Sequence, residues 1–444
     1  MPLKISRPNV IWIFGDQHRA QALGCNGDPN LHTPNLDRLG AEGVNFTRAL
    51  MGAPLCCPCR GSLLTSLYPH QCVPGHEHPL PPNQPTLAQT LGENGYHTAY
   101  FGKWHLDGWH ETQGRAAFHH VPRRRRGGFD SWIGYENNNS PWDCHVHGHD
   151  STGEREMSRL PGFETDALTD LLIHHLGDRT NFPDQPFFAA LSVQPPHNPY
   201  AAPEAWMARH TPAQIQLRQN VPNVDGVTER ARRDLAGYYA MIENLDWNVG
   251  RIRDALYQSG QWQNTHIVFF SDHGDMHGSH GQFLKTSPWE ESVRVPFIIG
   301  GGVPFYELKV GQCDAPINHV DVAPTTLGLC GIDAPDWMRG TDYSGERVRD
   351  RAVKAPDSAF LQMVIPTGHG DSVDRPWRGV VTRDGWKYAV LEGQPWLMFD
   401  LNQDPLEQVN LAHNMRFGNK RRQLQERLMR WIDETGDAFA LPSL

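Results

Sequence analysis

Cysteine is scarce in this sequence, basic residues are not in excess, and long apolar runs are missing. Eight cysteines among 444 residues are too few for a scaffold held together by disulfides. Forty basic and fifty acidic residues leave a formal net charge of −10. This balance argues against a general nucleic-acid-binding protein, which shows a basic excess. No stretch approaches the roughly 20 apolar residues of a transmembrane helix.

The amino-terminal residues do not read as a secretory signal. The first eight are short and polar, and the apolar run 9–14 is too brief for a signal peptide with a cleavage site. We therefore expect a cytoplasmic protein with reduced thiols, and export of a precursor trimmed before this point stays open. Histidine is abundant, with 24 residues. Because histidine commonly binds metals and transfers protons, its number favours a metalloenzyme over a structural protein.

Short apolar runs alternate with helical patterns along the first 350 residues. The spacing of apolar residues from Leu235 to Leu256 predicts a long amphipathic helix. Shorter helices are predicted at 35–42, 86–93 and 322–330. Strands alternating with helices indicate an α/β sheet covered on both faces. The runs that predict buried parallel strands are 10–14, 187–193, 267–270 and 295–299.

Two regions depart from this alternation. Residues 106–163 show little periodicity, which predicts a long functional or disordered loop. Beyond about residue 350, β-like pieces at 379–382 and 386–391 precede a predicted helix at 419–433. We therefore predict a catalytic α/β domain at 1–350 and a smaller C-terminal α+β subdomain at 351–444. Aromatic and histidine side chains in the irregular region are candidates for a substrate-binding wall: Trp109, Trp132, Tyr135, Trp142, His145 and His147.

Polar side chains follow two of the predicted strands. Asp16 and Gln17 come just after the first strand, and Asp272 and His273 come just after the strand at 267–270. Open α/β sheets bind ligands beyond the carboxyl ends of their strands. Each pair alone is equally compatible with a capped turn. Together, carboxylate and amide oxygens with one imidazole predict a divalent-cation site.

Three cysteines lie within four positions, at Cys56, Cys57 and Cys59. A zinc site is the first alternative, but no matching pair of ligands follows this cluster. A redox C-x-x-C exists formally from Cys56 to Cys59, although Pro58 lies inside it and no thioredoxin-like context surrounds it. Zinc and redox roles for this cluster are therefore disfavoured.

Cys56, Pro58 and Arg60 fit the C-x-P-x-R signature of a known family, and the sequence resembles the type I sulfatases of the alkaline-phosphatase-like superfamily. In that family the first cysteine is oxidised to formylglycine, whose hydrated aldehyde is the nucleophile. The resemblance covers nearly the whole chain. Besides the signature and Lys285, it includes the segments 9–16, 33–37, 102–106, 196–199, 271–274, 290–296, 319–325 and 399–401.

The resemblance implies a role for each matching residue. Lys103 and Lys285, with the metal, would place positive charge around the sulfate oxygens, and Arg60 would hold the nucleophile. His197 resembles the acid that protonates the departing alcohol, and His105 resembles the base that restores the aldehyde. One divalent cation, calcium in preference to manganese or magnesium, would be held by Asp16, Gln17, Asp272, His273 and the modified Cys56.

The sequence departs from the family pattern at two positions. The fourth signature position is most often serine in the family and is Cys59 here, which leaves the extent of Cys56 modification open. Gln17 replaces the second acid of a common Asp-Asp pair, as in the choline-sulfatase and phosphonate monoester hydrolase branch. The latter hydrolases lack the Lys and His of the Gly-Lys-x-His motif, whereas Lys103 and His105 are both present.

The predicted function is therefore hydrolysis of a sulfate monoester on a small saccharide or an aryl group. The alternatives are a phosphonate monoester or phosphodiester hydrolase and, from another class, a catalytically silent anion-binding relative. The implied partners are a small sulfated substrate and a maturation enzyme that generates formylglycine. We expect binding to neither nucleic acid nor membranes. The sequence leaves open whether the chain forms a homo-oligomer.

Overall fold

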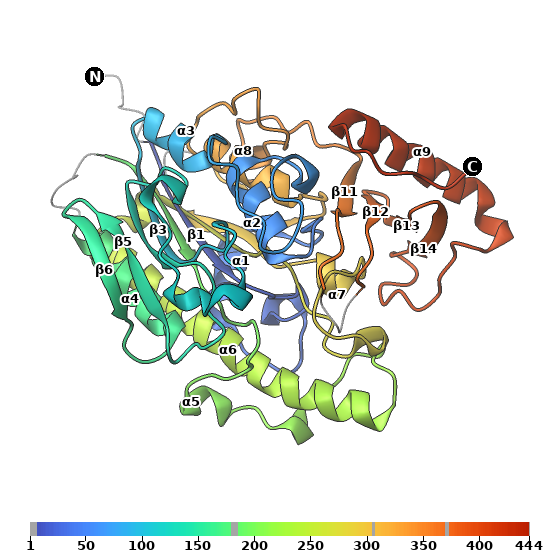
Figure 1. Cartoon of the computed structure of the whole chain (residues 1–444), viewed down its shortest axis with the longest axis horizontal. Helices are drawn as coiled ribbons and strands as arrows, with labels where there is room; N and C mark the ends of the chain where they lie inside the picture. The colour runs from blue at the N-terminus through green and yellow to red at the C-terminus, as the bar shows by residue number, and fades with distance from the viewer. Residues whose placement is uncertain (1–6, 179–184, 304–306, 369–372, 444) are drawn as a thin grey trace.

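The computed structural model describes residues 7–178, 185–303, 307–368 and 373–443. Its centre is a mixed, mostly parallel sheet of ten strands in the order β10-β2-β9-β8-β1-β7-β3-β4-β5-β6 (Figure 1). The strands are β1 Asn9–Gly15, β2 Val44–Phe46, β3 His97–Lys103, β4 Ser131–Tyr135, β5 His145–Asp150, β6 Gly153–Arg159, β7 Phe187–Ser192, β8 Thr265–Ser271, β9 Phe297–Gly302 and β10 Gly311–Cys313.

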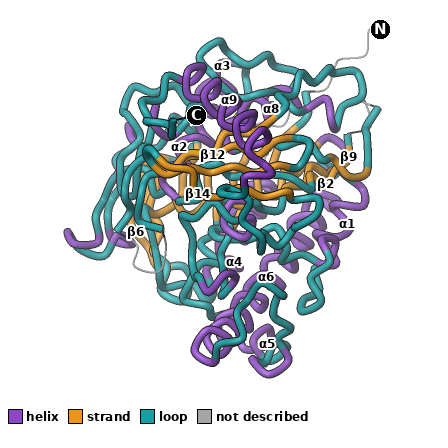
Figure 2. Tube along the Cα trace, turned by 90° about the vertical axis from the view of Figure 1, so that its right-hand side faces the viewer, coloured by secondary structure: helices purple, strands orange, loops and turns teal. Residues whose placement is uncertain are grey.

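Helices cover both faces of the central sheet, as predicted (Figure 2). In β1, Trp12 packs toward the face of α2, α3 and α8, whereas Ile11 and Ile13 pack toward the face of α1, α4 and α6. Because both faces are buried, β1 is apolar throughout rather than alternating. The helices are α1 Pro34–Glu42, α2 Cys56–Thr65, α3 Leu87–Glu93, α4 Glu164–Gly177, α5 Glu204–Met207, α6 Asp225–Gln258, α7 Glu290–Val293 and α8 Val322–Leu329.

A second sheet lies in the C-terminal part of the chain, as predicted. It is antiparallel, with strands β11 Ser358–Met363, β12 Trp377–Thr382, β13 Trp386–Leu391 and β14 Gln394–Asp400 in sequential order. Helix α9, Gly418–Thr435, packs on this sheet through Leu424, Leu428 and Ile432. The exact domain boundary at residue 350 stays a prediction.

Two sequence predictions about the sheet were wrong. The run 295–299 was predicted to be parallel, but β9 pairs antiparallel with β8. After β8 the chain turns through loops and the short helix α7, so it re-enters the sheet from the edge where β8 ends. The region 106–163 was predicted to be irregular, but it contains β4, β5 and β6. The many polar residues of β5 and β6 conceal the strand pattern because these strands form one edge of the sheet.

Among the described residues, no helix has both the length and the apolar character needed to cross a membrane.

Candidate functional site

The sheet brings the predicted site residues to one edge. β1 lies between β8 and β7, and β3 pairs with β7 in parallel. Asp16 follows β1, Asp272 follows β8, and Lys103 is the last residue of β3. All three side chains are buried. The site therefore forms at the carboxyl ends of parallel strands, where open α/β sheets bind their ligands.

Helix α2 delivers Cys56 and Arg60 to this edge together. Cys56 is the first residue of the helix, and Pro58 lies in its first turn, where no intrahelical N–H bond is lost. Arg60 follows Cys56 by four residues, so the two side chains share one face of the helix. The spacing of the cysteine motif thus directs a thiol and a guanidinium toward the same two carboxylates.

Four side chains meet closely enough to hold one metal ion. Ligand atoms of Asp16, Cys56, Asp272 and His273 all lie within 4.8 Å of one another. The Sγ atom of Cys56 lies 3.2 Å from His273 Nε2 and 3.5 Å from Asp16 Oδ1. The other ring nitrogen of His273, Nδ1, lies 3.0 Å from the carbonyl oxygen of Gly274. When Nδ1 carries the ring proton, its N–H donates a hydrogen bond to the Gly274 carbonyl. The lone pair on Nε2 then faces the carboxylates.

Gln17 contributes to the site through its backbone and through one amide oxygen. It adopts a positive φ of 75°, and its N–H donates to Asp272 Oδ1 at 3.2 Å. Its side-chain Nε2 donates to Asp275 Oδ2 at 2.6 Å and to the Tyr200 hydroxyl at 3.3 Å. These bonds fix the amide, and its buried Oε1 has no hydrogen-bond partner among the described residues. An unsatisfied buried oxygen on the residue that follows Asp16 fits a further metal ligand.

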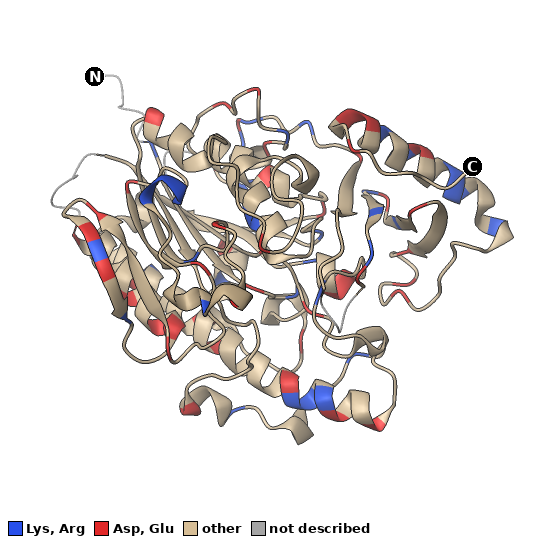
Figure 3. Ribbon diagram, in the orientation of Figure 1, with Lys and Arg blue, Asp and Glu red and all other residues tan. Residues whose placement is uncertain are grey.

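Three cations surround the carboxylates. Arg60 bridges Asp272 at 3.0 Å and Asp16 at 3.3 Å. Lys103 Nζ lies 2.6 Å from Asp16 Oδ2, and Lys285 Nζ lies 3.1 Å from Cys56 Sγ. Elsewhere, acidic and basic side chains are interspersed along α6 and α9 (Figure 3). Attraction of an anion to this acidic protein therefore depends on the cations inside the site.

The two predicted acid–base histidines have different surroundings. His197 Nε2 lies 3.2 Å from Lys285 Nζ, and its Nδ1 lies 2.7 Å from the carbonyl oxygen of Asn198. His105 has a positive φ of 57° and is buried, but neither ring nitrogen has a hydrogen-bond partner in the described part of the chain. Its imidazole lies against that of His76, with ring centroids 5.2 Å apart. The structure thus links His197 to Cys56 through Lys285 and places His105 beside His76.

Charge at the site shifts the pKa of several groups. Burial and Asp16 raise the pKa of the Cys56 thiol, but Lys103 and Lys285 outweigh them and lower it. Burial opposes ionisation of Asp16, yet Lys103 and the other cations hold its pKa well below the usual range. Burial, with Lys285 close by, holds the pKa of His197 well below its usual value. The site is therefore built to hold negative charge at position 56 and a neutral imidazole at His197.

Two supporting residues were missed by the sequence analysis. Ser192, the last residue of β7, accepts from Arg60 at 2.8 Å. Asp275 orients the side chain of Gln17. The rule that found Asp16 does not select Ser192, since this residue lies one position before the end of the predicted strand 187–193. It does not select Asp275 either, because this residue belongs to an irregular loop.

Only some of the residues predicted to form a substrate-binding wall have exposed side chains. Trp132 and Tyr135 are completely buried, and Trp132 packs against Trp104 and Tyr100. The prediction for these two residues was wrong, because both belong to β4 rather than to a loop. Trp142 is exposed.

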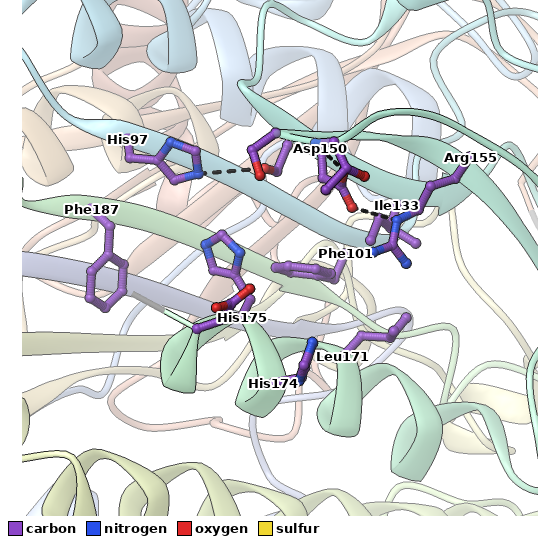
Figure 4. A pocket seen from close by; sticks show the side chains of 13 residues that line it. His97, Phe101, Ile133, Asp150, Arg155, Leu171, His174, His175 and Phe187 are labelled. Atoms are coloured by element: carbon purple, nitrogen blue, oxygen red, sulfur yellow. Dashed lines mark hydrogen bonds and ion pairs between the residues drawn. The ribbon is translucent and has the colours of Figure 1, made fainter. Parts of the chain in front are cut away.

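A separate cleft lies at the opposite edge of the sheet. Figure 4 shows it between the strands and helix α4, with His97, Phe101 and His175 among its lining side chains. His97 and Phe187 begin β3 and β7, so this cleft opens at the amino ends of the strands. It is therefore distinct from the site around Cys56, which forms at their carboxyl ends.

Comparison with known proteins places this geometry in context. The family model described as Sulfatase matches residues 8–332, and the model described as N-sulphoglucosamine sulphohydrolase, C-terminal, matches residues 278–434. The chain is 35% identical to the ulvan-active sulfatase of Formosa agariphila, over 98% of this chain and 83% of that protein. It is 28% identical to the choline-sulfatase of Rhizobium meliloti, over 92% of this chain and 83% of that protein.

The fold is shared with a protein solved in complex with its substrate D-glucosamine-2-N,6-O-disulfate. The TM-score is 0.85 at 22% sequence identity, and the match covers 97% of this chain and 99% of the other.

Proposed function

The chain belongs to the sulfatase family and is an enzyme that hydrolyses sulfate esters, and we propose that its substrate is a sulfate monoester on a saccharide. The nucleophile of this proposal is a formylglycine made from Cys56 by a maturation enzyme, assisted by one divalent cation. A single observation carries it: the buried cluster of Asp16, Cys56, Asp272 and His273 is enclosed by three cations. The similarity to an ulvan-active sulfatase supports the choice of a saccharide.

The donor set fits a hard divalent cation. Asp16 and Asp272 offer carboxylate oxygens, and His273 offers Nε2. Gln17 offers a buried amide oxygen that has no partner within the described part of the chain. Oxygen-rich sets of this kind suit calcium, and one imidazole also admits manganese or magnesium. We propose calcium. Such an ion would screen the two carboxylates from each other and from a bound sulfate.

Formylglycine, when hydrated, supplies a hydroxyl group as the nucleophile at position 56. Arg60 is held by Asp16, Asp272 and Ser192, so its guanidinium is fixed beside that position. Lys103 and Lys285 would bind sulfate oxygens and stabilise the charge that builds up as the sulfur–oxygen bond breaks. Because these cations are already in place before the substrate binds, the site needs little reorganisation during the reaction.

His197 is the proposed proton donor to the departing alcohol. With Nδ1 bonded to the Asn198 carbonyl, Nε2 is the atom that faces Lys285 and the site. Burial keeps this imidazole neutral in the free protein, and the negative charge of a bound sulfate would favour its protonation. His105 is the proposed base that accepts a proton at position 56, and its ring nitrogens, which have no hydrogen-bond partner among the described residues, leave it able to do so.

Mass spectrometry of the peptide containing Cys56 tests the nucleophile. The expected result, after expression with the maturation enzyme, is the mass decrease of cysteine-to-aldehyde conversion together with sulfate release. Unmodified Cys56 in an active preparation would disprove the formylglycine step. Metal analysis of the purified protein decides between calcium, manganese and magnesium. Comparison of kcat/KM on aryl sulfates and phenyl phosphonate esters separates a sulfatase from a phosphonate monoester hydrolase.

A further inference from the structure

A second cluster of metal-ligating side chains lies beside the site and takes no part in the proposed reaction as a unit. Ligand atoms of Cys57, His76 and His105 all lie within 4.8 Å of one another. The Sγ atom of Cys57 is 4.0 Å from His76 Nδ1. One thiol and two imidazoles form a soft donor set, unlike the oxygen-rich set around Asp16.

Glu77 supports two members of this cluster. Its backbone N–H donates to Cys57 Sγ at 3.3 Å, and its carboxylate Oε1 lies 3.7 Å from His76 Nε2. An N–H bonded to a sulfur is a support that metal ligands commonly have, and the carboxylate lies within ion-pair distance of the far nitrogen of His76. Glu77 adopts a positive φ of 54°, which is costly for a residue with a side chain. The turn that directs the Glu77 N–H toward the sulfur of Cys57 therefore contains a strained backbone conformation.

His105 supplies an independent indication of a ligand. Its side chain is only 2% exposed, yet both of its ring nitrogens lack a hydrogen-bond partner among the described residues. A buried imidazole with no partner carries a desolvation cost that a bound cation would offset. An entry path exists, because the side chain of His76 is 24% exposed.

We propose that Cys57, His76 and His105 bind a thiophilic divalent cation, with Zn²⁺ as the best match, and that this ion inhibits the enzyme. Zinc bonds of about 2.3 Å to sulfur and about 2.0–2.1 Å to nitrogen place tetrahedral ligand atoms roughly 3.3–3.6 Å apart. The three atoms, which lie within 4.8 Å of one another, need to approach by about 1.5 Å at most, which side-chain rotation supplies. On binding, the S–H bond of Cys57 breaks, its proton leaves to solvent, and the sulfur bonds to the metal.

Inhibition follows from the identity of the third ligand and rests on the proposed function. A ring nitrogen bonded to zinc cannot accept a proton, so His105 could not act as the base. Calcium does not compete for this cluster, because it prefers oxygen ligands. Calcium at the first site and zinc at the second can therefore be bound together.

Cobalt spectroscopy on the full-length chain tests the binding site without using activity. The protein is saturated with Ca²⁺, carries Cys56→Ser to remove the nearest other thiol, and is titrated with Co²⁺. We expect a thiolate-to-cobalt charge-transfer band and the visible spectrum of a tetrahedral ion, saturating at one equivalent. Adding Cys57→Ser should abolish the band, whereas Cys330→Ser, a buried cysteine in the core elsewhere, should preserve it. His76→Ala should weaken binding at least about tenfold.

Two outcomes would overturn the site: a band that persists without Cys57, or no band in any variant. Zinc inhibition is then measured on the mature enzyme. Cys57→Ser, checked for formylglycine conversion, should need at least about tenfold more Zn²⁺ for half-inhibition than the unsubstituted enzyme. Equal inhibition of both would disprove the regulatory role. A protein without sulfatase activity would contradict the proposed function instead, and the cobalt spectrum would still decide the metal site.

Discussion

The ammonium nitrogen of Lys285 lies 3.1 Å from the sulfur of Cys56. Both residues that flank Lys285 have positive φ angles, 62° at Leu284 and 74° at Thr286. Thr286 is tied further by its N–H, which donates to the carbonyl of Pro54. The loop is therefore held in an uncommon conformation that directs one cation to the side chain of Cys56.

Removal of this cation should affect turnover more than folding. We expect Lys285→Ala to lower kcat/KM on an aryl sulfate by about 10²- to 10³-fold, since one preorganised charge that stabilises the transition state is lost. Lys285→Arg should recover part of the loss, because the charge is kept but its position changes. Steady-state kinetics with a circular dichroism control measure this. A loss below tenfold in Lys285→Ala would show that the ammonium group does not face the reacting sulfate.

Arg60 should matter for stability as well as for activity. Its guanidinium is buried between Asp16 and Asp272. In calcium-free protein, Arg60→Ala leaves two buried carboxylates without this partner and should cost about 3–5 kcal/mol in the free energy of unfolding. Urea denaturation measures the change. Arg38→Ala, which breaks an exposed pair with Glu42, is the matched control and should cost less than about 1 kcal/mol. Equal costs for the two variants would contradict the bridging role.

Sequence patterns were sufficient to locate the carboxylates but not the complete site. Asp16 and Asp272 follow continuous apolar strands, and a parallel sheet necessarily collects such residues at one edge. The role of Cys56 came only from resemblance, because no local pattern shows that α2 points its first turn at that edge. Asp275 lies in an irregular loop, whose path depends on long-range contacts rather than on periodicity.

Strand direction and edge strands were the main gaps in the predicted fold. A strand buried on both faces is apolar throughout in either direction, so the composition of β9 could not reveal that it is antiparallel to β8. The last two strands of the sheet, β5 and β6, contain many histidines and charged residues. Their polar character resembles that of a loop, and only the pairing of β5 with β4 and of β6 with β5 makes them part of the sheet.

The loop that carries His105 should depend on Glu136. This buried carboxylate accepts backbone N–H groups from Leu106, Asp107, Gly108 and Trp109. Glu136→Ala should leave these donors unsatisfied, cost about 1–3 kcal/mol in stability and lower kcat more than it raises KM. Glu136→Gln keeps an acceptor oxygen and should retain more of both. Unfolding curves and kinetics measure the two effects. An unchanged kcat in a folded Glu136→Ala variant would remove any positioning role.

The buried imidazole of His266 should make the folded state sensitive to acid. Burial, with Arg347 nearby, lowers its pKa from 6.5 to about 3. Between these values the unfolded chain binds the proton and the folded chain does not, so the contribution to stability is complete above pH 6.5 and is lost as the pH falls toward 3. His266→Phe removes this proton. The difference in unfolding free energy between variant and unsubstituted protein should therefore shift in favour of the variant by about 1.4 kcal/mol per pH unit over the middle of this range. Urea denaturation at pH 7, 6 and 5 measures the slope. A pH-independent difference for His266→Phe would mean that this imidazole takes up its proton equally in the folded and unfolded states.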